Sequence, residues 1–251
     1  MITRQRQLVI IPTYNEADNL PPLVAAILAL QADFHILVVD DNSPDGTGII
    51  ADGLAQSHPE VHVMHRPAKL GLGPAYIAGF EWALAEGYDY VFEMDCDFSH
   101  DPIALPRFLS EIQSADLVIG SRYVKGGSTP DWTVKRRLIS RGGNLVSRAL
   151  LRLKTHDATG GFRCYRRELL EQIPWYEICA RGYGFQVASI FYAERLGARI
   201  QEFPITFQDR RVGQSKMSAG IVKEALTCVM ELAFYDLKKR PVAQEPREIA
   251  P

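Results

Sequence analysis

The first half of the chain alternates short apolar runs with segments whose apolar residues recur every three or four positions. The apolar runs predict β-strands at residues 8–11, 36–39, 61–65, 90–94 and 116–120. The intervening segments predict helices at residues 18–30, 47–57, 74–86 and 102–112. Strands that are apolar throughout are typical of a parallel sheet covered on both faces. We therefore expect an α/β fold with a mostly parallel sheet and right-handed crossovers.

The pattern changes after residue 123. A loop is expected at residues 126–131, a basic helix at 136–153 with a break near Gly142 and Gly143, and a glycine-rich turn at 155–161. Strands are then expected at 162–165, 199–203 and 206–209, and helices at 183–196 and 218–239. We expect one domain over residues 1–240 and a polar, proline-rich, disordered tail at 241–251.

Composition narrows the function classes. The 251 residues can bury a substantial core, and the net charge of −2 gives no global field that would attract nucleic acid. The four cysteines are scattered without Cys-x-x-Cys spacing, which argues against a zinc site. The first residues lack a secretory signal pattern, and no apolar run has the length of a membrane span. We expect a cytoplasmic protein with reduced thiols.

One stretch of the sequence carries charges of only one sign. Residues 135–154 carry lysines and arginines but no Asp or Glu, interspersed with leucine, isoleucine and valine. An amphipathic helix with basic residues can lie in the headgroup region of anionic lipid, so we expect peripheral contact with a membrane. In the alternative, its apolar face packs on the core.

Polar clusters follow four of the predicted strands, at residues 12–16, 40–43, 95–97 and 120–122. In open α/β sheets, ligands bind beyond the carboxyl ends of the strands. Asp95 and Asp97 are one residue apart, so in extended backbone their side chains point the same way and can converge on one hard cation such as Mg²⁺ or Mn²⁺. Taken alone, the pair also fits a solvated acidic turn.

The other clusters suggest binding of a nucleotide and a phosphate. Pro12 is expected to end the first strand, Tyr14 can stack on a base, and Glu16 can accept a hydrogen bond from a ribose or base. Asp41 can hold a nucleobase or ribose, whereas residues 45–47 look like a turn that caps the next helix.

Three basic features could meet phosphate. Lys69 precedes two glycines and a predicted helix, although a plain loop has the same pattern. Arg122 and Arg136 have no acidic neighbours in the sequence to pair with, which favours a phosphate clamp. The basic loop at residues 208–216 could cover an anionic ligand or simply lie on the surface. His100, close to Asp97, is expected at the surface.

Taken together, these motifs resemble the family 2 glycosyltransferases of the GT-A fold, and most closely the dolichol- or polyprenol-phosphate mannose synthases. The resemblance rests on residues 10–16 (IIPTYNE), 38–47 (VVDDNSPDGT), 69–73 (KLGLG), 94–100 (MDCDFSH) and 120–123 (GSRY). It spans residues 7–239, almost the whole chain.

The resemblance implies an inverting enzyme that moves mannose from GDP-mannose to a polyprenyl or dolichyl monophosphate. It implies a nucleotide-binding half at residues 1–123 and an acceptor-binding half at 124–240. It implies a location on the cytoplasmic face of a membrane, reached by the chain itself or through a small membrane anchor protein.

The resemblance also assigns roles to individual residues. The donor nucleotide would contact Pro12, Tyr14, Glu16, Val39, Asp41, Lys69 and Asp95. The Mg²⁺ or Mn²⁺ cofactor would be held by Asp95, Asp97 and Ser99. The acceptor phosphate would be bound by Arg122, Arg136, Ser140, Arg210 and Lys216. Catalysis would depend on Asp97, Arg122 and Arg136.

The chain departs from the family at two places. Residues 186–188 read Gln-Val-Ala where the family often has Gln-x-Glu, and residues 212–216 read Val-Gly-Gln-Ser-Lys where it often has Tyr-Gly-Glu-Ser-Lys. These departures leave a UDP-glucose-dependent glucosyltransferase and a silent sugar-nucleotide-binding subunit as alternatives. A sugar-1-phosphate nucleotidyltransferase would show an N-terminal glycine-rich loop, which this sequence lacks.

Overall fold

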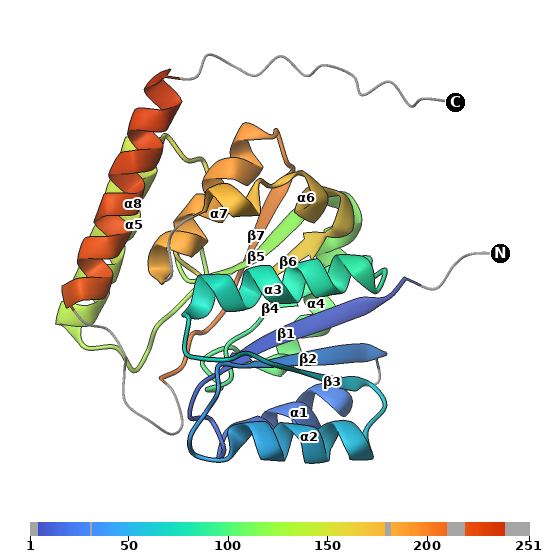
Figure 1. Ribbon diagram of the computed structural model, residues 1–251. Helices are drawn as coiled ribbons and strands as arrows, with labels where there is room; N and C mark the ends of the chain where they lie inside the picture. Colours follow the sequence, from blue (N-terminus) through green and yellow to red (C-terminus); the bar gives the residue numbers. More distant parts are fainter. Residues whose placement is uncertain (1–4, 31, 179–181, 210–218, 239–251) are drawn as a thin grey trace, which may run out of the picture.

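A computed structural model describes residues 5–30, 32–178, 182–209 and 219–238 (Figure 1). Its centre is one seven-stranded sheet with the order β3-β2-β1-β4-β6-β5-β7. The strands are β1 (Gln7–Thr13), β2 (Phe34–Asp40), β3 (Val61–His65), β4 (Tyr90–Glu93), β5 (Leu117–Ser121), β6 (Arg163–Arg166) and β7 (Ile200–Pro204). Only β6 runs antiparallel to its neighbours, so the predicted mostly parallel α/β sheet is confirmed.

Helices cover both faces of the sheet (Figure 1). They are α1 (Leu20–Leu28), α2 (Thr47–Ser57), α3 (Leu72–Ala85), α4 (Leu105–Glu111), α5 (Val134–Leu151), α6 (Arg167–Gln172), α7 (Tyr183–Arg195) and α8 (Ala219–Lys238). Single 3₁₀ turns occur at η1 (Pro102–Ala104), η2 (Ile112–Ser114) and η3 (Trp175–Glu177).

Alternate residues of β1 point into two separate cores. Leu8 and Ile10 pack with the side chains of α3, α6 and α7, whereas Val9 and Ile11 pack with those of α1 and α4. Both faces of β1 are therefore buried away from water, which is why its sequence is apolar throughout.

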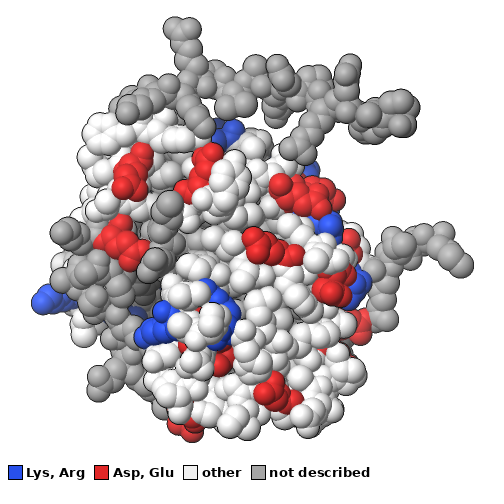
Figure 2. Space-filling view, viewed as in Figure 1, with Lys and Arg blue, Asp and Glu red and all other residues white. Residues whose placement is uncertain are grey.

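The last helix, α8, lies beside α5, outside the layer formed by α7 (Figure 1). Of the helices within the described ranges, none is long and apolar enough to cross a membrane. On the face shown in Figure 2, basic side chains gather left of centre and acidic ones are dispersed, so neither sign of charge dominates.

Some predicted boundaries were wrong. Pro12 does not end β1, which continues to Thr13; the ladder with β4 stops at Ile10, so a residue without an N–H is tolerated there. α5 runs unbroken through Gly142 and Gly143.

In the second half, one further prediction failed and one helix was missed. Residues 206–209 form no strand beyond a single bridge between Ser128 and Thr206. Helix α6 was not anticipated, because six residues are too short to show a periodic pattern. The predicted tail at 241–251 lies outside the described residues.

Candidate active site

The carboxyl ends of β1, β2, β4 and β5 lie at the same edge of the sheet because these four strands point the same way. The polar clusters predicted from the sequence follow these strands. The fold therefore gathers residues far apart in the chain along one edge, as expected for a ligand site in an open α/β sheet.

The turn after β4 is held by hydrogen bonds from its backbone amides to its own side chains. The Nδ1 atom of His100 accepts a hydrogen bond from the amide of Asp95 at 3.1 Å, and a carboxylate oxygen of Asp97 accepts from the amide of Ser99 at 3.0 Å. Phe98 adopts a left-handed φ of 61° between them. His100 is buried, not at the surface as predicted, and burial lowers its pKa to about 4, so the ring is neutral at pH 7.

This turn offers oxygen atoms that suit a hard divalent cation. The Oγ atom of Ser99 is buried and has no hydrogen-bond partner among the described residues, two positions after Asp97. A buried hydroxyl without a partner is costly, and a cation or ligand that uses it removes that cost. In the described ranges, this turn included, no three His, Cys, Asp or Glu side chains cluster as a metal site. Two carboxylates and a hydroxyl fit Mg²⁺ or Mn²⁺ with positions left for ligand oxygens.

After β2, the carboxylate of Asp41 ties a neighbouring loop to the sheet. One oxygen accepts from Arg66 Nη1 at 2.6 Å, and the other accepts from the amides of Leu70 and Gly71 at 3.1 and 3.2 Å. Gly71 has a φ of 105°, a conformation that glycine adopts without strain. Asp41 thus fixes the loop that carries Lys69, a role that the sequence did not suggest.

Lys69 also reaches the first strand end. Its Nζ atom lies 3.9 Å from the centre of the Tyr14 ring, a cation–π contact between the β3–α3 and β1–α1 loops. Glu16 accepts from the side-chain amide of Asn19 at 2.8 Å. Pro12 is partly exposed at the end of β1, whereas the side chain of Val39 is fully buried in the core, so only its backbone faces this edge.

Asp45 has the structural role predicted for it. Its carboxylate accepts from the amide of Thr47 at 3.0 Å and from the Thr47 hydroxyl at 2.6 Å, at the start of α2. Burial opposes ionisation, but these bonds outweigh it and hold the pKa of Asp45 below its usual value.

Arg122, just beyond β5, is paired with an acid, contrary to the prediction. Its guanidinium donates to both carboxylate oxygens of Asp157 at 2.8 and 2.7 Å and to the hydroxyl of Thr159 at 2.8 Å. Asp157 also accepts from the Arg122 amide at 2.9 Å. Asp157 could not be recognised as the partner from the sequence, because it lies far along the chain, in the glycine-rich turn at residues 155–161.

Arg136 at the start of α5 is also paired, with Asp209. The indole of Trp132 is near both arginines: the Cζ atom of Arg136 is 4.3 Å from the ring centre and that of Arg122 is 5.6 Å. The Ser140 hydroxyl bonds the Tyr123 hydroxyl at 2.6 Å. The fold therefore brings Arg122, Arg136 and Ser140 into one neighbourhood. Arg210 and Lys216 lie outside the described residues.

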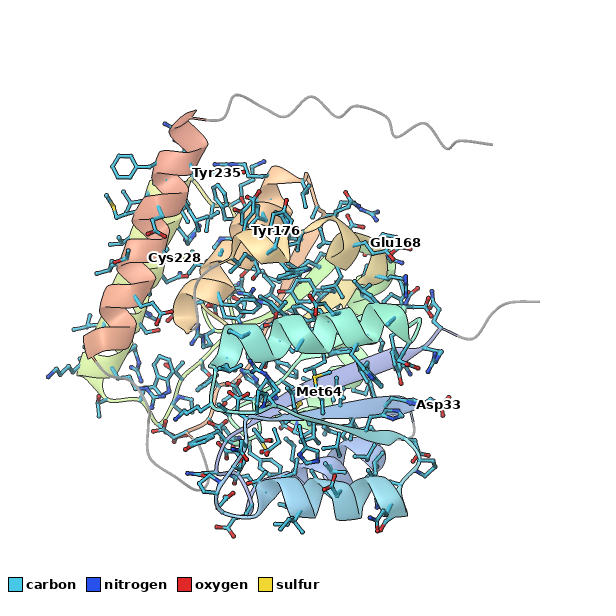
Figure 3. The ribbon with its side chains drawn as sticks, viewed as in Figure 1. Asp33, Met64, Glu168, Tyr176, Cys228 and Tyr235 are labelled. Atoms are coloured by element: carbon cyan, nitrogen blue, oxygen red, sulfur yellow. The ribbon has the colours of Figure 1, made fainter. Side chains whose placement is uncertain are left out.

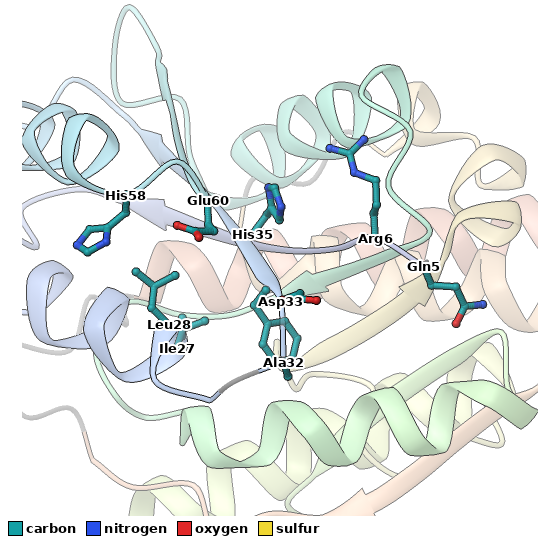
Figure 4. A pocket seen from close by; sticks show the side chains of 10 residues that line it. Gln5, Arg6, Ile27, Leu28, Ala32, Asp33, His35, His58 and Glu60 are labelled. Atoms are coloured by element: carbon teal, nitrogen blue, oxygen red, sulfur yellow. The ribbon is translucent and has the colours of Figure 1, made fainter. Parts of the chain in front are cut away.

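A separate cavity of 650 Å³ opens at the opposite, amino end of the strands (Figure 4). Its lining consists of Gln5, Arg6, Ile27, Leu28, Ala32, Asp33, Phe34, His35, His58 and Glu60. None of the predicted site residues lies there.

The family described as "Glycosyl transferase family 2" matches residues 8–174. The chain belongs to glycosyl transferase family 2. A Micrococcus luteus protein named undecaprenyl-phosphate mannosyltransferase is 51% identical over 224 residues, 89% of this chain and 92% of that protein. A Mycolicibacterium smegmatis protein named polyprenol monophosphomannose synthase is 50% identical over 229 residues, 90% of this chain and 86% of that protein.

Solved structures of more distant proteins share the fold. Glucosyl-3-phosphoglycerate synthase from Mycobacterium tuberculosis, solved with Mn²⁺, UDP-glucose and phosphoglyceric acid, has a TM-score of 0.66 at 19% identity, with 92% of this chain and 80% of that chain covered. Mannosyl-3-phosphoglycerate synthase from Rubrobacter xylanophilus has a TM-score of 0.65 at 18% identity, with coverage of 95% and 77%. The predicted GT-A fold is confirmed.

Two residues of this candidate site were missed by sequence reasoning. Arg66 and Asp157 each hold a predicted residue, Asp41 and Arg122, in place. Both ion pairs are almost fully buried, and both partners come from loops whose positions are set by tertiary structure. A basic residue directly after the third predicted strand was the only local signal for Arg66.

Proposed function

We propose that this chain transfers mannose from GDP-mannose to a polyprenyl monophosphate, with inversion at the anomeric carbon. The observation that carries the proposal is that Arg122 and Arg136 both contact Trp132, with Arg122 following β5 at the sheet edge where Asp95 and Asp97 follow β4. The two relatives at about half identity, whose names specify mannosyl transfer to such lipids, support it.

The donor would occupy the ends of β1, β2 and β4. Tyr14 and Lys69 would meet the base and phosphates, with Asp41 holding their loop, and Pro12, Glu16 and the backbone of Val39 would complete the guanosine site. A divalent cation held by Asp95, Asp97 and Ser99 would offset the negative charge of the departing diphosphate. On this view residues 1–123 serve the donor and residues 124–240 the acceptor.

The charge of the acceptor phosphate determines which groups the protein must supply. A phosphate monoester has a second pKa of about 6, so it is mostly dianionic at pH 7 and needs no general base. Its difficulty is repulsion from the anionic donor. Arg122 and Arg136, with Ser140 nearby, would offset that repulsion and orient the attacking oxygen. Asp157 fixes Arg122 with two parallel bonds, so the guanidinium is oriented before the lipid arrives.

We also propose that α5 and α8 dock on an anionic membrane surface. Six large apolar side chains of α5 and three of α8 are exposed: Val134, Leu138, Ile139, Leu145, Val146, Leu150, Leu226, Met230 and Phe234. Those of α5 lie in or next to the basic, acid-free stretch 135–154, as suits a lipid surface, whereas Met230 of α8 is followed by the exposed Glu231. The exposure of six apolar side chains on α5 supports docking over the alternative that its apolar face packs on the core.

The opposite side of α8 is fixed to the protein. The Tyr235 hydroxyl donates to Glu177 at 3.0 Å, and the Cys228 thiol lies 3.6 Å from the carbonyl of Gly184 (Figure 3). Val229 and Leu232 are buried. The exposed residues of α8 are therefore held at the surface, next to α5, which carries Arg136.

Thermal denaturation with nucleotides tests the donor assignment. GDP with Mn²⁺ is expected to raise the melting temperature well above the effect of UDP with Mn²⁺, because a ligand that binds only the folded state stabilises it. Stabilisation by UDP but not GDP would favour the glucosyltransferase alternative. Binding of GDP-mannose without any transfer would favour a silent subunit.

A further inference from the structure

A glycine stands in the middle of the candidate site. β6 pairs with β4 and β5 such that Arg163 is opposite both Glu93 and Ile119. Extending both registers by two residues brings Gly161 opposite Asp95 on one side and Ser121 on the other. The paired ladder itself stops at Glu93 and Arg163, so this register places Gly161 and Asp95 just beyond the same end of β4 and β6. Gly161 itself is partly exposed.

The missing side chain leaves a space of defined size. A Cβ atom at position 161 would lie 3.4 Å from the Nε2 atom of Gln186 and 3.8 Å from the Cε1 atom of His100. These are ordinary contact distances, and the φ of Gly161 lies outside the left-handed region. Neither crowding nor backbone strain therefore requires glycine here. We call the space between Gln186 and His100 the Gly161 notch.

Gln186 presents its Nε2 atom to this notch, 3.4 Å from the Cβ position, whereas its side-chain oxygen comes no closer than its Cδ atom at 3.9 Å. Its Nε2 donates to the buried carboxyl of Glu93 at 2.7 Å, and Glu93 also accepts from the hydroxyl of Tyr165 at 2.9 Å. The Oε1 atom of Gln186 is buried and has no hydrogen-bond partner in the described part of the chain. Leaving an amide oxygen in this state is unfavourable, and a donor that reaches it recovers the loss.

One buried guanidinium holds the backbone of the Gly161 turn and that of Gln186. Arg163 donates to the carbonyl oxygens of Ala158 and Gly160 at 3.1 and 2.8 Å, and to that of Gln186 at 3.0 Å. The turn that carries Gly161 and the helix that carries Gln186 are thereby fixed relative to each other. Such a rigid frame favours discrimination, because a ligand group must fit a preformed position.

We propose that the Gly161 notch receives one hydroxyl group of the transferred sugar, and that this hydroxyl donates to the side-chain oxygen of Gln186. This inference rests on the proposed function, since it needs a sugar nucleotide at Asp95. The notch accepts a group of methyl or hydroxyl size, so it distinguishes sugars by the hydroxyl they place there. Gln186 and Gly161 would thus help to determine which hexose is used.

Gly161→Ala tests this cleanly, because its methyl group fills the notch without a clash or strain. The assay measures the affinities of GDP and of GDP-mannose, each with Mn²⁺, and kcat/KM for transfer. We expect GDP affinity to stay within about twofold, while GDP-mannose affinity and kcat/KM fall roughly 10-fold or more. Gly53→Ala on α2 is the control, since no atom lies within 4 Å of that Cβ position. Wild-type use of GDP-mannose by Gly161→Ala overturns the inference.

Deoxy donors identify the bond itself. In the wild type, one of the 2-, 3-, 4- and 6-deoxy derivatives of GDP-mannose should lose roughly 10-fold in kcat/KM. In Gln186→Met, that derivative and GDP-mannose should be used equally. Ser189→Ala, whose hydroxyl bonds Arg163, should keep the wild-type preference. The same preference in Gln186→Met overturns the inference.

If the wild type transfers glucose from UDP-glucose instead, the proposed donor is wrong. The activities of Gly161→Ala, Gly53→Ala, Gln186→Met and Ser189→Ala are then measured with UDP-glucose as the donor. A selective loss in Gly161→Ala supports the notch, and equal activity overturns it.

Discussion

Replacing Asp157 by Asn removes the charge that balances Arg122. Both side chains are almost entirely buried, with exposed fractions of 6% for Arg122 and 0% for Asp157. Breaking a buried ion pair costs about 3–5 kcal/mol, and Asn retains one acceptor oxygen, so we expect about 3 kcal/mol. For a chain of this size each kcal/mol lowers Tm by about 2–4 °C, which gives a fall of about 6–12 °C.

The effect should also have a defined pH dependence. Burial alone would raise the pKa of Asp157, but the Arg122 guanidinium outweighs burial and holds it below its usual value. A carboxylate with a lowered pKa contributes its full stability above the unfolded-state pKa of about 3.9, and loses it as pH falls through the lower folded-state value. The difference between wild type and Asp157→Asn should therefore be constant between pH 8 and 5.

Urea unfolding at several pH values measures this difference. Glu111→Gln provides a matched control, since its ion pair with Arg107 lies at the surface and should contribute less than about 1 kcal/mol. The reasoning is refuted if Asp157→Asn lowers the free energy of unfolding by less than about 1 kcal/mol. It is also refuted if the difference in this free energy between wild type and variant disappears between pH 8 and 5.

Three further predictions concern the site and the membrane. Asp97→Ala should abolish Mn²⁺-dependent transfer while Tm without ligand stays close to wild type; activity within a few-fold of wild type would reject the metal assignment. Arg122→Ala and Arg136→Ala should raise KM for a polyprenyl phosphate about 10-fold or more and leave GDP affinity nearly unchanged, whereas equal losses in both titrations would contradict the division of roles. Leu145→Asp should reduce flotation with anionic vesicles at low salt, while Ile49→Asp, exposed on α2, should not; no flotation of the wild type would point to a separate anchor protein.

Much of the fold was predictable because its physical basis is local. The bounds of α2 and β3 agree residue by residue with the apolar pattern, since both are bordered by turn residues such as Gly46 and Pro59. The antiparallel direction of β6 was not predictable, because it depends on the edge of the sheet at which the chain arrives after α5. The unbroken α5 shows that two adjacent glycines lower helix propensity without ending a helix.

The candidate site was predictable where its residues follow strands. Asp41, Asp95 and Arg122 lie where the pattern placed them, because a parallel sheet aligns its carboxyl ends. The partners of these residues were not predictable. Asp157, for example, is 35 residues from Arg122 in the chain and meets it only through the antiparallel return of β6. The expectation that Arg122 had no acidic partner failed for this reason.

A transfer assay tests the central claim most directly. The purified chain is mixed with Mn²⁺, a short-chain polyprenyl phosphate and either GDP-[¹⁴C]mannose or UDP-[¹⁴C]glucose, and the lipid product is extracted and its anomeric configuration determined. The account predicts labelled β-mannosyl phosphate lipid from GDP-mannose and little product from UDP-glucose. Product from UDP-glucose alone, an α-linked product, or no product from either donor would contradict it.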